Sequence, residues 1–182
     1  MSVRILAIDF ETADNGTDSA CAVGLALIQN GKITEQSHYL IRPPRQKILY
    51  SDIHGIFWED VADQPSFGEL WPELEPTFKQ ADFFAAHSAR FDRSILYGSC
   101  AAYGIFAPNK PWLCTVKLAR AAWNIFPTKL PNVCEHFDIP LRHHDAMSDA
   151  RACAEITLRA WHEGRDLSAG IMGSVKYAVS RV

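Results

Sequence analysis

The side chains in this chain with the most evident chemistry are four carboxylates and one histidine. Asp9 and Glu11 lie in Ile-Asp-Phe-Glu-Thr, Asp92 lies in Ser-Ala-Arg-Phe-Asp, and His144 and Asp149 lie in His-Asp-Ala-Met-Ser-Asp. Each motif adjoins an apolar run, where a carboxylate is unfavourable unless something positive offsets it. A pair of hard divalent cations would offset four carboxylates, and two such cations in one site promote phosphodiester cleavage.

The first two carboxylates stand at the end of an apolar run that predicts a buried strand. Asp9 and Glu11 are two residues apart, and side chains with this spacing share one face of a strand. Carboxylates this close repel each other unless a cation lies between them. The alternative, an acidic strand end exposed to water, stays open for this pair taken alone.

The other two carboxylates each fall in the first turn of an expected helix. Asp92 and Asp149 would complement a helix dipole there even without a ligand, so that alternative also stays open. Ala146 and Ala150 flank Asp149, and small residues let a helix approach a sheet closely. Such an approach would carry Asp149, with His144 just ahead of it, towards the strand pair.

The bulk composition indicates one ordinary globular domain. The chain has 182 residues, of which 48% are hydrophobic and 21% charged, enough for a full core. Its net charge of −3 does not exclude nucleic acid, because taking away the four candidate metal ligands leaves +1. The five cysteines form no C-x-x-C pair and are expected to be reduced. Without a signal-peptide pattern or a long apolar run, we expect a soluble, cytoplasmic protein that does not contact a membrane.

Three strands are expected at the start of the chain, at residues 3–8, 20–29 and 32–41. Asn30-Gly31 joins the last two and is a strong hairpin signal. The later elements are an irregular stretch at 45–64, strands at 82–87 and 112–115, and helices at 91–103, 115–123, 130–137 and 146–162.

A further helix is predicted over residues 66–80, with Ser66 and Glu69 as a capping box. Pro72 and Pro76 predict a kink or a break in it. An antiparallel opening followed by alternating helix and strand indicates an α/β fold, a mixed sheet whose first three strands are antiparallel and which helices flank. Residues 1–164 are expected to form this domain, and residues 165–182 a surface tail.

Taken in this order, the motifs resemble those of the DEDDh 3′–5′ exonucleases. This family of the ribonuclease-H-like superfamily includes the proofreading subunit of bacterial replicative polymerase. The likeness spans about residues 3 to 160, and Ile53-His54-Gly55-Ile56 is closer to the DNA-directed proofreading branch than to oligoribonucleases. The matching stretches are 9–12, 53–56, 65–67, 87–92 with Leu96, and 144–150.

The resemblance implies a metal-dependent nuclease that releases nucleoside 5′-monophosphates from the 3′ end of DNA, with single strands preferred. Asp9, Glu11, Asp92 and Asp149 would hold two Mg²⁺ or Mn²⁺ ions, and His144 would be the general base. The residues expected to meet the substrate are Phe10, Thr12, Ala13, Ile56, Phe57, His87 and Phe91.

A second histidine, His143, directly precedes His144. Adjacent side chains of an extended segment point in opposite directions, so we expect only His144 to face the metal ligands. Basic side chains could follow the phosphates or simply be solvated: Arg42, Arg45, Lys47, Arg90 and Arg93.

The chain departs from the family pattern at two positions and in length. Ser88 stands where the family usually has Asn, and Ala13 where it has Ser or Thr. The chain ends at Val182, too early for the tail that tethers a proofreading subunit to its polymerase, so no tether is expected. An exoribonuclease of the same superfamily and a non-catalytic nucleic-acid-binding module remain alternatives, and the physiological pathway and the oligomeric state stay open.

Overall fold

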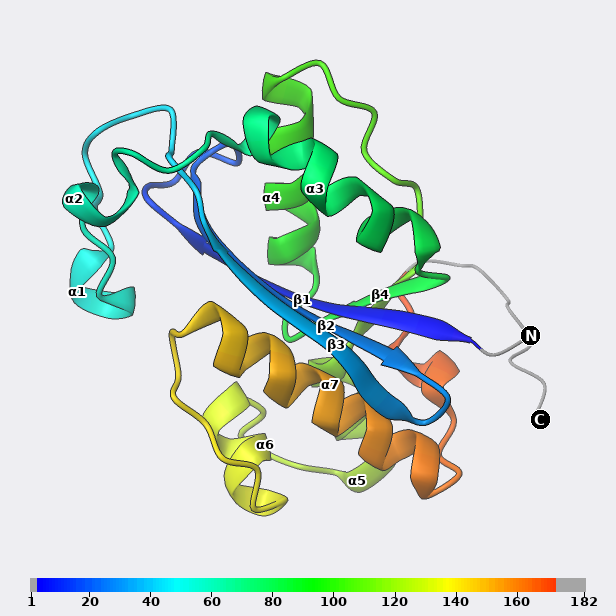
Figure 1. Ribbon diagram of the computed structural model, residues 1–182. Coiled ribbons are helices and arrows are strands. Elements are labelled where there is room, and N and C mark those ends of the chain that lie inside the picture. The colour runs from blue at the N-terminus through cyan, green and yellow to red at the C-terminus, as the bar shows by residue number, and fades with distance from the viewer. Residues whose placement is uncertain (1–2, 173–182) are drawn as a thin grey trace.

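A mixed five-stranded sheet forms the centre of the computed structural model, which describes residues 3–172 (Figure 1). The strand order is β3-β2-β1-β4-β5, with β1 and β2 antiparallel, β2 and β3 antiparallel, and β4 and β5 parallel to β1 and to each other. The predicted mixed sheet is thereby confirmed. The strands are β1 (Arg4–Thr12), β2 (Ala20–Gln29), β3 (Lys32–Leu40), β4 (Phe83–Ala86) and β5 (Trp112–Cys114).

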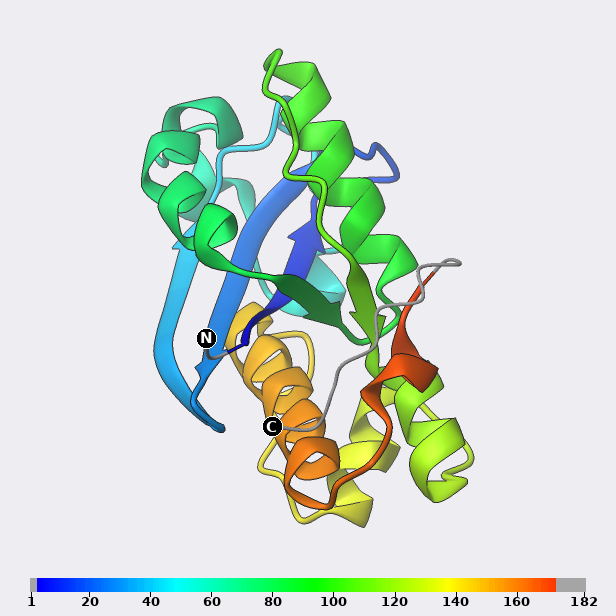
Figure 2. The same cartoon turned by 90° about the vertical axis from the view of Figure 1, so that its right-hand side faces the viewer.

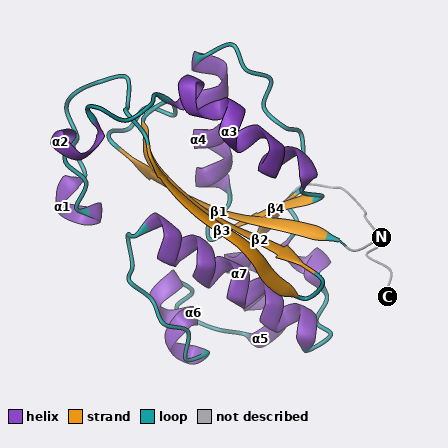
Figure 3. Ribbon diagram, in the orientation of Figure 1, coloured by secondary structure: helices purple, strands orange, loops and turns teal. Residues whose placement is uncertain are grey.

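Helices cover both faces of this sheet, as Figures 2 and 3 show. One face packs against α3 and α4 and the other against α5 and α7, while α6 packs on α5 and α7. The helices are α1 (Ser51–His54), α2 (Trp58–Val61), α3 (Phe67–Gln80), α4 (Arg90–Ala102), α5 (Thr115–Trp123), α6 (Leu130–His136), α7 (Ala146–His162) and the 3-10 helix η1 (Leu167–Gly170).

The alternation of side chains along β1 decides which face its acids occupy. Leu6 and Ile8 belong to the core on the α3 and α4 side, whereas Ile5 and Ala7 belong to the core against α5 and α7. Because side chains alternate between the two faces of a strand, residue 9 lies on the same face as Ile5 and Ala7. Asp9 therefore lies on the α7 side, beyond the last apolar layer of that face.

The predicted capping box of α3 is confirmed, and the predicted break is wrong. Ser66 accepts a hydrogen bond from the Glu69 backbone N–H, while the Glu69 carboxylate accepts one from the Ser66 N–H. The helix then continues through Pro72 and Pro76 without interruption. Both prolines are on the exposed side, where water can satisfy the carbonyls that lose their partners.

Two other segments differ from expectation. The stretch expected to be irregular contains the short helices α1 and α2. The beginning of the expected surface tail is packed instead, because Gly170 is buried and Ile171 forms an antiparallel bridge with Leu113 at the sheet edge. The rest of that tail, residues 173–182, lies outside the described residues. Within residues 3–172, no helix is long and apolar enough to cross a membrane.

Candidate active site

Three of the four predicted carboxylates meet at one point of the structure. Oxygen atoms of Asp9, Glu11 and Asp149 all lie within 4.8 Å of one another. The first two come from β1 and the third from the first turn of α7, so residues 138 positions apart in the sequence share one site. Oxygen donors so arranged are the ligands that hard divalent cations prefer.

A glycine that the sequence alone did not single out permits this meeting. Gly24 on β2 pairs directly with Asp9 on β1, and α7 begins against it. A Cβ at Gly24 would lie 2.0 Å from the backbone oxygen of Ala146, far inside contact distance. Only glycine at this position lets the start of α7, and with it Asp149, come so close to the sheet.

The fourth carboxylate reaches the site from α4. Asp92 lies in the first turn of α4 and is 1% exposed. Its Oδ1 accepts a hydrogen bond of 3.0 Å from the backbone N–H of Phe10, the residue between the two acids of β1. This hydrogen bond anchors the Asp92 carboxylate at the strand. The negative charge of Asp92 contributes to the raised pKa of Asp9.

The electrostatics of the cluster favour a cation. Burial first, and then the neighbouring carboxylates, raise the pKa of Asp9 well above its usual value and that of Glu11 to about 8. Burial likewise raises the pKa of Asp92 to about 7 and that of Asp149 above its usual value. Asp149 is only 3% exposed, and its Oδ1 has no hydrogen-bond partner among residues 3–172. A buried oxygen left without a partner, beside two more acids, fits a metal ligand.

The two histidines before α7 lie side by side, contrary to the expectation that they point in opposite directions. The rings of His143 and His144 are stacked, with centroids 3.9 Å apart and planes at 22°. His144 has a φ of 69°, in the left-handed region, and this turn of the backbone places both rings on one side. Asp149 Oδ2 accepts from the backbone N–H of His144 at 3.1 Å and lies 2.7 Å from His143 Nδ1. Burial and then His143 lower the pKa of His144.

The segment containing α1 is tied to the end of β1 through another histidine. His54 Nε2 donates to the carbonyl oxygen of Thr12 at 3.2 Å, while its Nδ1 accepts from the Ile56 N–H at 3.1 Å. This arrangement brings the half-buried Ile56 and the exposed Phe57 to the border of the site. Phe91, also exposed, precedes Asp92 on the α4 side.

Three residues expected to contact substrate are engaged inside the protein. The Phe10 ring is buried and its N–H is bonded to Asp92, while the Ala13 N–H donates to Ser19 and its carbonyl accepts from Leu49. His87 uses both ring nitrogens, one on Thr115 Oγ1 at 2.9 Å and the other on the Thr128 carbonyl at 3.0 Å. These positions support the site from behind, in contrast to the exposed Phe57 and Phe91.

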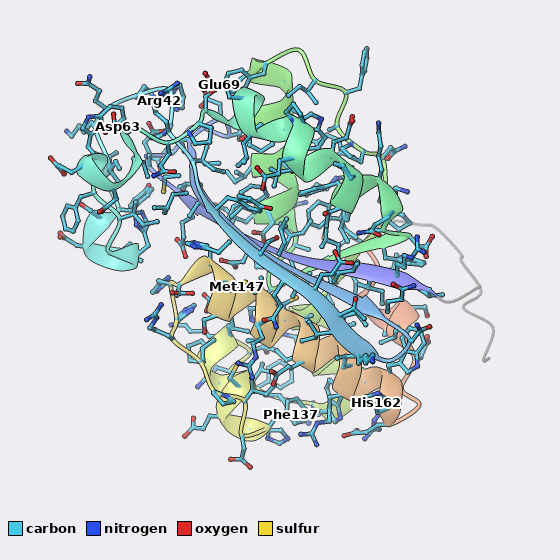
Figure 4. All side chains as sticks on the ribbon, viewed as in Figure 1. Arg42, Asp63, Glu69, Phe137, Met147 and His162 are labelled. Carbon is cyan, nitrogen blue, oxygen red and sulfur yellow. The ribbon has the colours of Figure 1, made fainter. Side chains whose placement is uncertain are left out.

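Two of the candidate phosphate-following residues are likewise paired within the protein. Arg45 binds both Asp14 and Asp18, each at 2.6 Å. Arg42 pairs with Glu69 at 2.9 Å, away from Met147 in the first turn of α7 (Figure 4). Their expected role along a phosphate backbone is therefore not supported, because acids already occupy these guanidinium groups.

Residues 6–157 match the RNase T family of exonucleases. The chain belongs to this exonuclease family. Among curated relatives, the PolC-type DNA polymerase III of Thermotoga petrophila is 32% identical over 162 residues, which cover 87% of this chain and 12% of the polymerase. Exodeoxyribonuclease 10 of Escherichia coli K12 is 30% identical over 141 residues, 71% of this chain and 56% of that enzyme. The chain thus spans only part of either relative.

Solved structures share the fold of this exonuclease. The nuclease domain of 3′hExo, a DEDDh family member bound to rAMP, has a TM-score of 0.80 at 18% identity and covers 96% of this chain and 98% of that one. Exonuclease X in complex with 5′ overhanging duplex DNA has a TM-score of 0.69 at 24% identity, covering 92% and 96%. These neighbours confirm the expected ribonuclease-H-like fold, and the family match confirms the expected exonuclease, a class of enzyme that implies divalent metal ions.

Proposed function

We propose that this exonuclease removes nucleotides from the 3′ end of DNA in a reaction that depends on Mg²⁺ or Mn²⁺. The observation that supports this most is the convergence of Asp9, Glu11 and Asp149 within 4.8 Å, with a buried oxygen of Asp149 to which no described residue donates a hydrogen bond. Three carboxylates this close repel one another unless a cation lies between them, and among them the His143 ring is within hydrogen-bond distance of Asp149 alone.

The carboxylates and His144 divide the work in this proposal. Asp9, Glu11 and Asp149 would hold the metal, with Asp92 beside them contributing directly or through water. Two such cations at one site supply charge stabilisation for both the attacking and the leaving oxygen of the phosphodiester. His144 would accept a proton from the attacking water, since its imidazole is exposed next to Asp149, and burial and then His143 lower its pKa, which keeps the ring neutral and able to accept. The products would be nucleoside 5′-monophosphates.

The exposed apolar residues at the border of the site favour an unpaired 3′ end. Phe57 and Phe91 are 51% and 46% exposed, and each lies near a residue that contacts β1. Aromatic rings stack on bases of any sequence, with about 1–3 kcal/mol per base. Ile56 and the backbone near Thr12 would receive the terminal nucleotide between these rings. A paired end would first have to fray, so single strands should be degraded faster.

DNA is proposed over RNA because Exodeoxyribonuclease 10 and the PolC-type polymerases carry DNA in their names. The structure of 3′hExo bound to rAMP favours an exoribonuclease as the second candidate. A nucleic-acid-binding module without catalysis is the third, and the presence of all four acids and His144 argues against it.

A digest of matched substrates tests the proposal. Single-stranded DNA, blunt duplex, duplex with a mismatched 3′ end and RNA of the same sequence would be labelled at the 5′ end and resolved at single-nucleotide steps. We expect the rate to fall from single strand to mismatch to duplex, and to be lower on RNA. Equal rates on all DNA ends would contradict the single-strand preference, faster RNA cleavage would favour the second candidate, and no cleavage of any substrate would favour the third.

A further inference from the structure

The stacked histidines form, with Asp149, a second group of ligand atoms that differs in chemistry from the carboxylate cluster. Nitrogen atoms of His143 and His144 and a carboxylate oxygen of Asp149 all lie within 4.8 Å of one another. The carboxylate cluster offers oxygen alone, whereas this group offers two imidazoles and one oxygen. Asp149 belongs to both groups.

Two imidazoles and a carboxylate match the ligand preference of zinc. Mg²⁺ takes oxygen ligands, while imidazole suits Zn²⁺ and other late transition metals. Three protein ligands with a fourth position open to water are a common zinc arrangement, with metal–ligand bonds of about 2.0–2.2 Å. Neighbouring ligand atoms then stand about 3.3 Å apart, so the 2.7 Å between His143 Nδ1 and Asp149 Oδ2 would need to open by only about 0.6 Å.

The surroundings of the group allow an ion to enter and to be held. Both histidines are exposed, so an ion reaches them directly from solvent. Asp149, in contrast, is buried, and its Oδ1 lacks a hydrogen-bond partner within the part of the chain that the structure describes. The loop that carries the rings is fixed at both ends, because Asp145 caps α7 and the Arg142 N–H donates to Ser148 Oγ at 2.8 Å.

We propose that His143, His144 and Asp149 form a zinc site that inhibits the enzyme. Zinc held there occupies the imidazole of His144 and an oxygen of Asp149, and both are withdrawn from the hydrolysis of the phosphodiester. The inhibitory effect rests on the proposed function, whereas zinc binding does not. His143 is the residue that separates the two sites, since it belongs to the histidine group alone.

The binding experiment uses the full chain after removal of metal with chelator. Zn²⁺ is titrated against a competing fluorescent chelator, and Co²⁺ serves as a spectroscopic probe whose absorption reports a tetrahedral nitrogen and oxygen environment. His143→Gln removes one ligand, while His136→Gln alters a matched exposed histidine on α6. Asp9→Asn disrupts the carboxylate cluster and leaves the histidine group intact. Circular dichroism and melting temperature verify that every variant is folded.

We expect one Zn²⁺ per chain, with affinity reduced at least about tenfold in His143→Gln, since even outer-shell changes at metal sites reduce affinity about 10–100-fold. His136→Gln and Asp9→Asn should bind zinc as the parent does. Unchanged zinc affinity in His143→Gln, or its loss in Asp9→Asn, would overturn the proposal by placing the ion in the carboxylate cluster.

An activity measurement then tests the inhibition. With Mg²⁺ present, Zn²⁺ should slow cleavage of single-stranded DNA, and His143→Gln should shift the inhibitory concentration upwards by the same factor as it weakens binding. Equal inhibition of both proteins would refute the inhibitory role. A chain that binds zinc through His143 yet cleaves no nucleic acid under any condition would refute the proposed nuclease function while leaving the zinc site in place.

Discussion

Substitution of Gly24 by alanine should damage the site from a strand that contributes none of its ligands. The new Cβ would lie 2.0 Å from the Ala146 oxygen and 2.3 Å from its carbonyl carbon. Reaching an ordinary contact of 3.4 Å requires the start of α7 to withdraw by roughly 1.4 Å. Asp149 lies in the first turn of that helix and would withdraw with it, away from Asp9 and Glu11.

The size of the effect follows from this displacement. A misplacement of about 1 Å in a catalytic site can reduce a rate about 10²-fold, and overpacking destabilises a core by about 1–3 kcal/mol. We therefore expect Gly24→Ala to lose about two orders of magnitude in rate and to need more Mg²⁺ for half-maximal activity. Single-turnover cleavage of single-stranded DNA over a range of Mg²⁺ concentrations, together with the melting temperature, measures both effects.

A second glycine supplies the control. A Cβ at Gly68 in α3 would lie 2.5 Å from the ring of Tyr103, a partly exposed side chain that can turn aside, on the face of the sheet opposite α7. Gly68→Ala should keep the parent rate and Mg²⁺ dependence. The reasoning fails if folded Gly24→Ala stays within about threefold of the parent, because α7 would then tolerate the extra carbon without moving Asp149.

The remaining predictions concern the ligands and the base. In EDTA, cleavage should stop, and the melting temperature should fall as the pH rises from about 5 to 8. The pKa of Glu11 in the folded state is about 8, above its ordinary value of 4.5. The folded state therefore holds more protons than the unfolded state in this range and loses stability as they leave. Thermal melts at several pH values check this, Mg²⁺ should reverse the trend, and a flat profile would contradict it. Asp9→Ala and Asp149→Ala should lose nearly all turnover while still binding DNA in a filter assay; a residual rate above about a tenth, a loss under ~1.4 kcal/mol, would remove them from the metal site. His144→Ala should lower the steady-state rate about 10²–10⁴-fold, the usual range for a general base, while His143→Ala stays within a few-fold; the reverse pattern would assign the base to His143.

The sheet and its last helix could be predicted because local signals and tertiary packing agree there. Asn30-Gly31 has positive φ at both residues, as a tight hairpin demands, and the strand bounds 20–29 match those observed. The bounds of the helix at 146–162 also match, since small buried residues mark its inner side. The placement of Asp9 and Glu11 on one face of β1 could be predicted from the alternation of side chains along a strand.

Other features depended on contacts that no local pattern records. Nothing near Gly24 in the sequence indicates that α7 crosses it, because the contact joins residues more than 120 positions apart. The left-handed conformation of His144 reversed the expected orientation of two adjacent side chains. The continuity of α3 through two prolines, and the packing of Ile171 at the sheet edge, likewise result from tertiary contacts that outweigh local propensity.

The way the acids are held also explains why the site can exist before a cation arrives. Asp92 is fixed by the Phe10 N–H and Asp149 by the His144 N–H and the His143 ring, so neither needs a metal to keep its position. Asp9 and Glu11 are fixed by the strand itself. Among residues 3–172, what raises the pKa values of Asp9 and Glu11 is burial first and then other carboxylates, so these residues add no positive charge beside the β1 pair. The fold therefore sets the positions of the four carboxylates, and the bound cation would supply the positive charge that offsets them. Removal of the cation should alter stability and activity more than it alters the arrangement of the backbone.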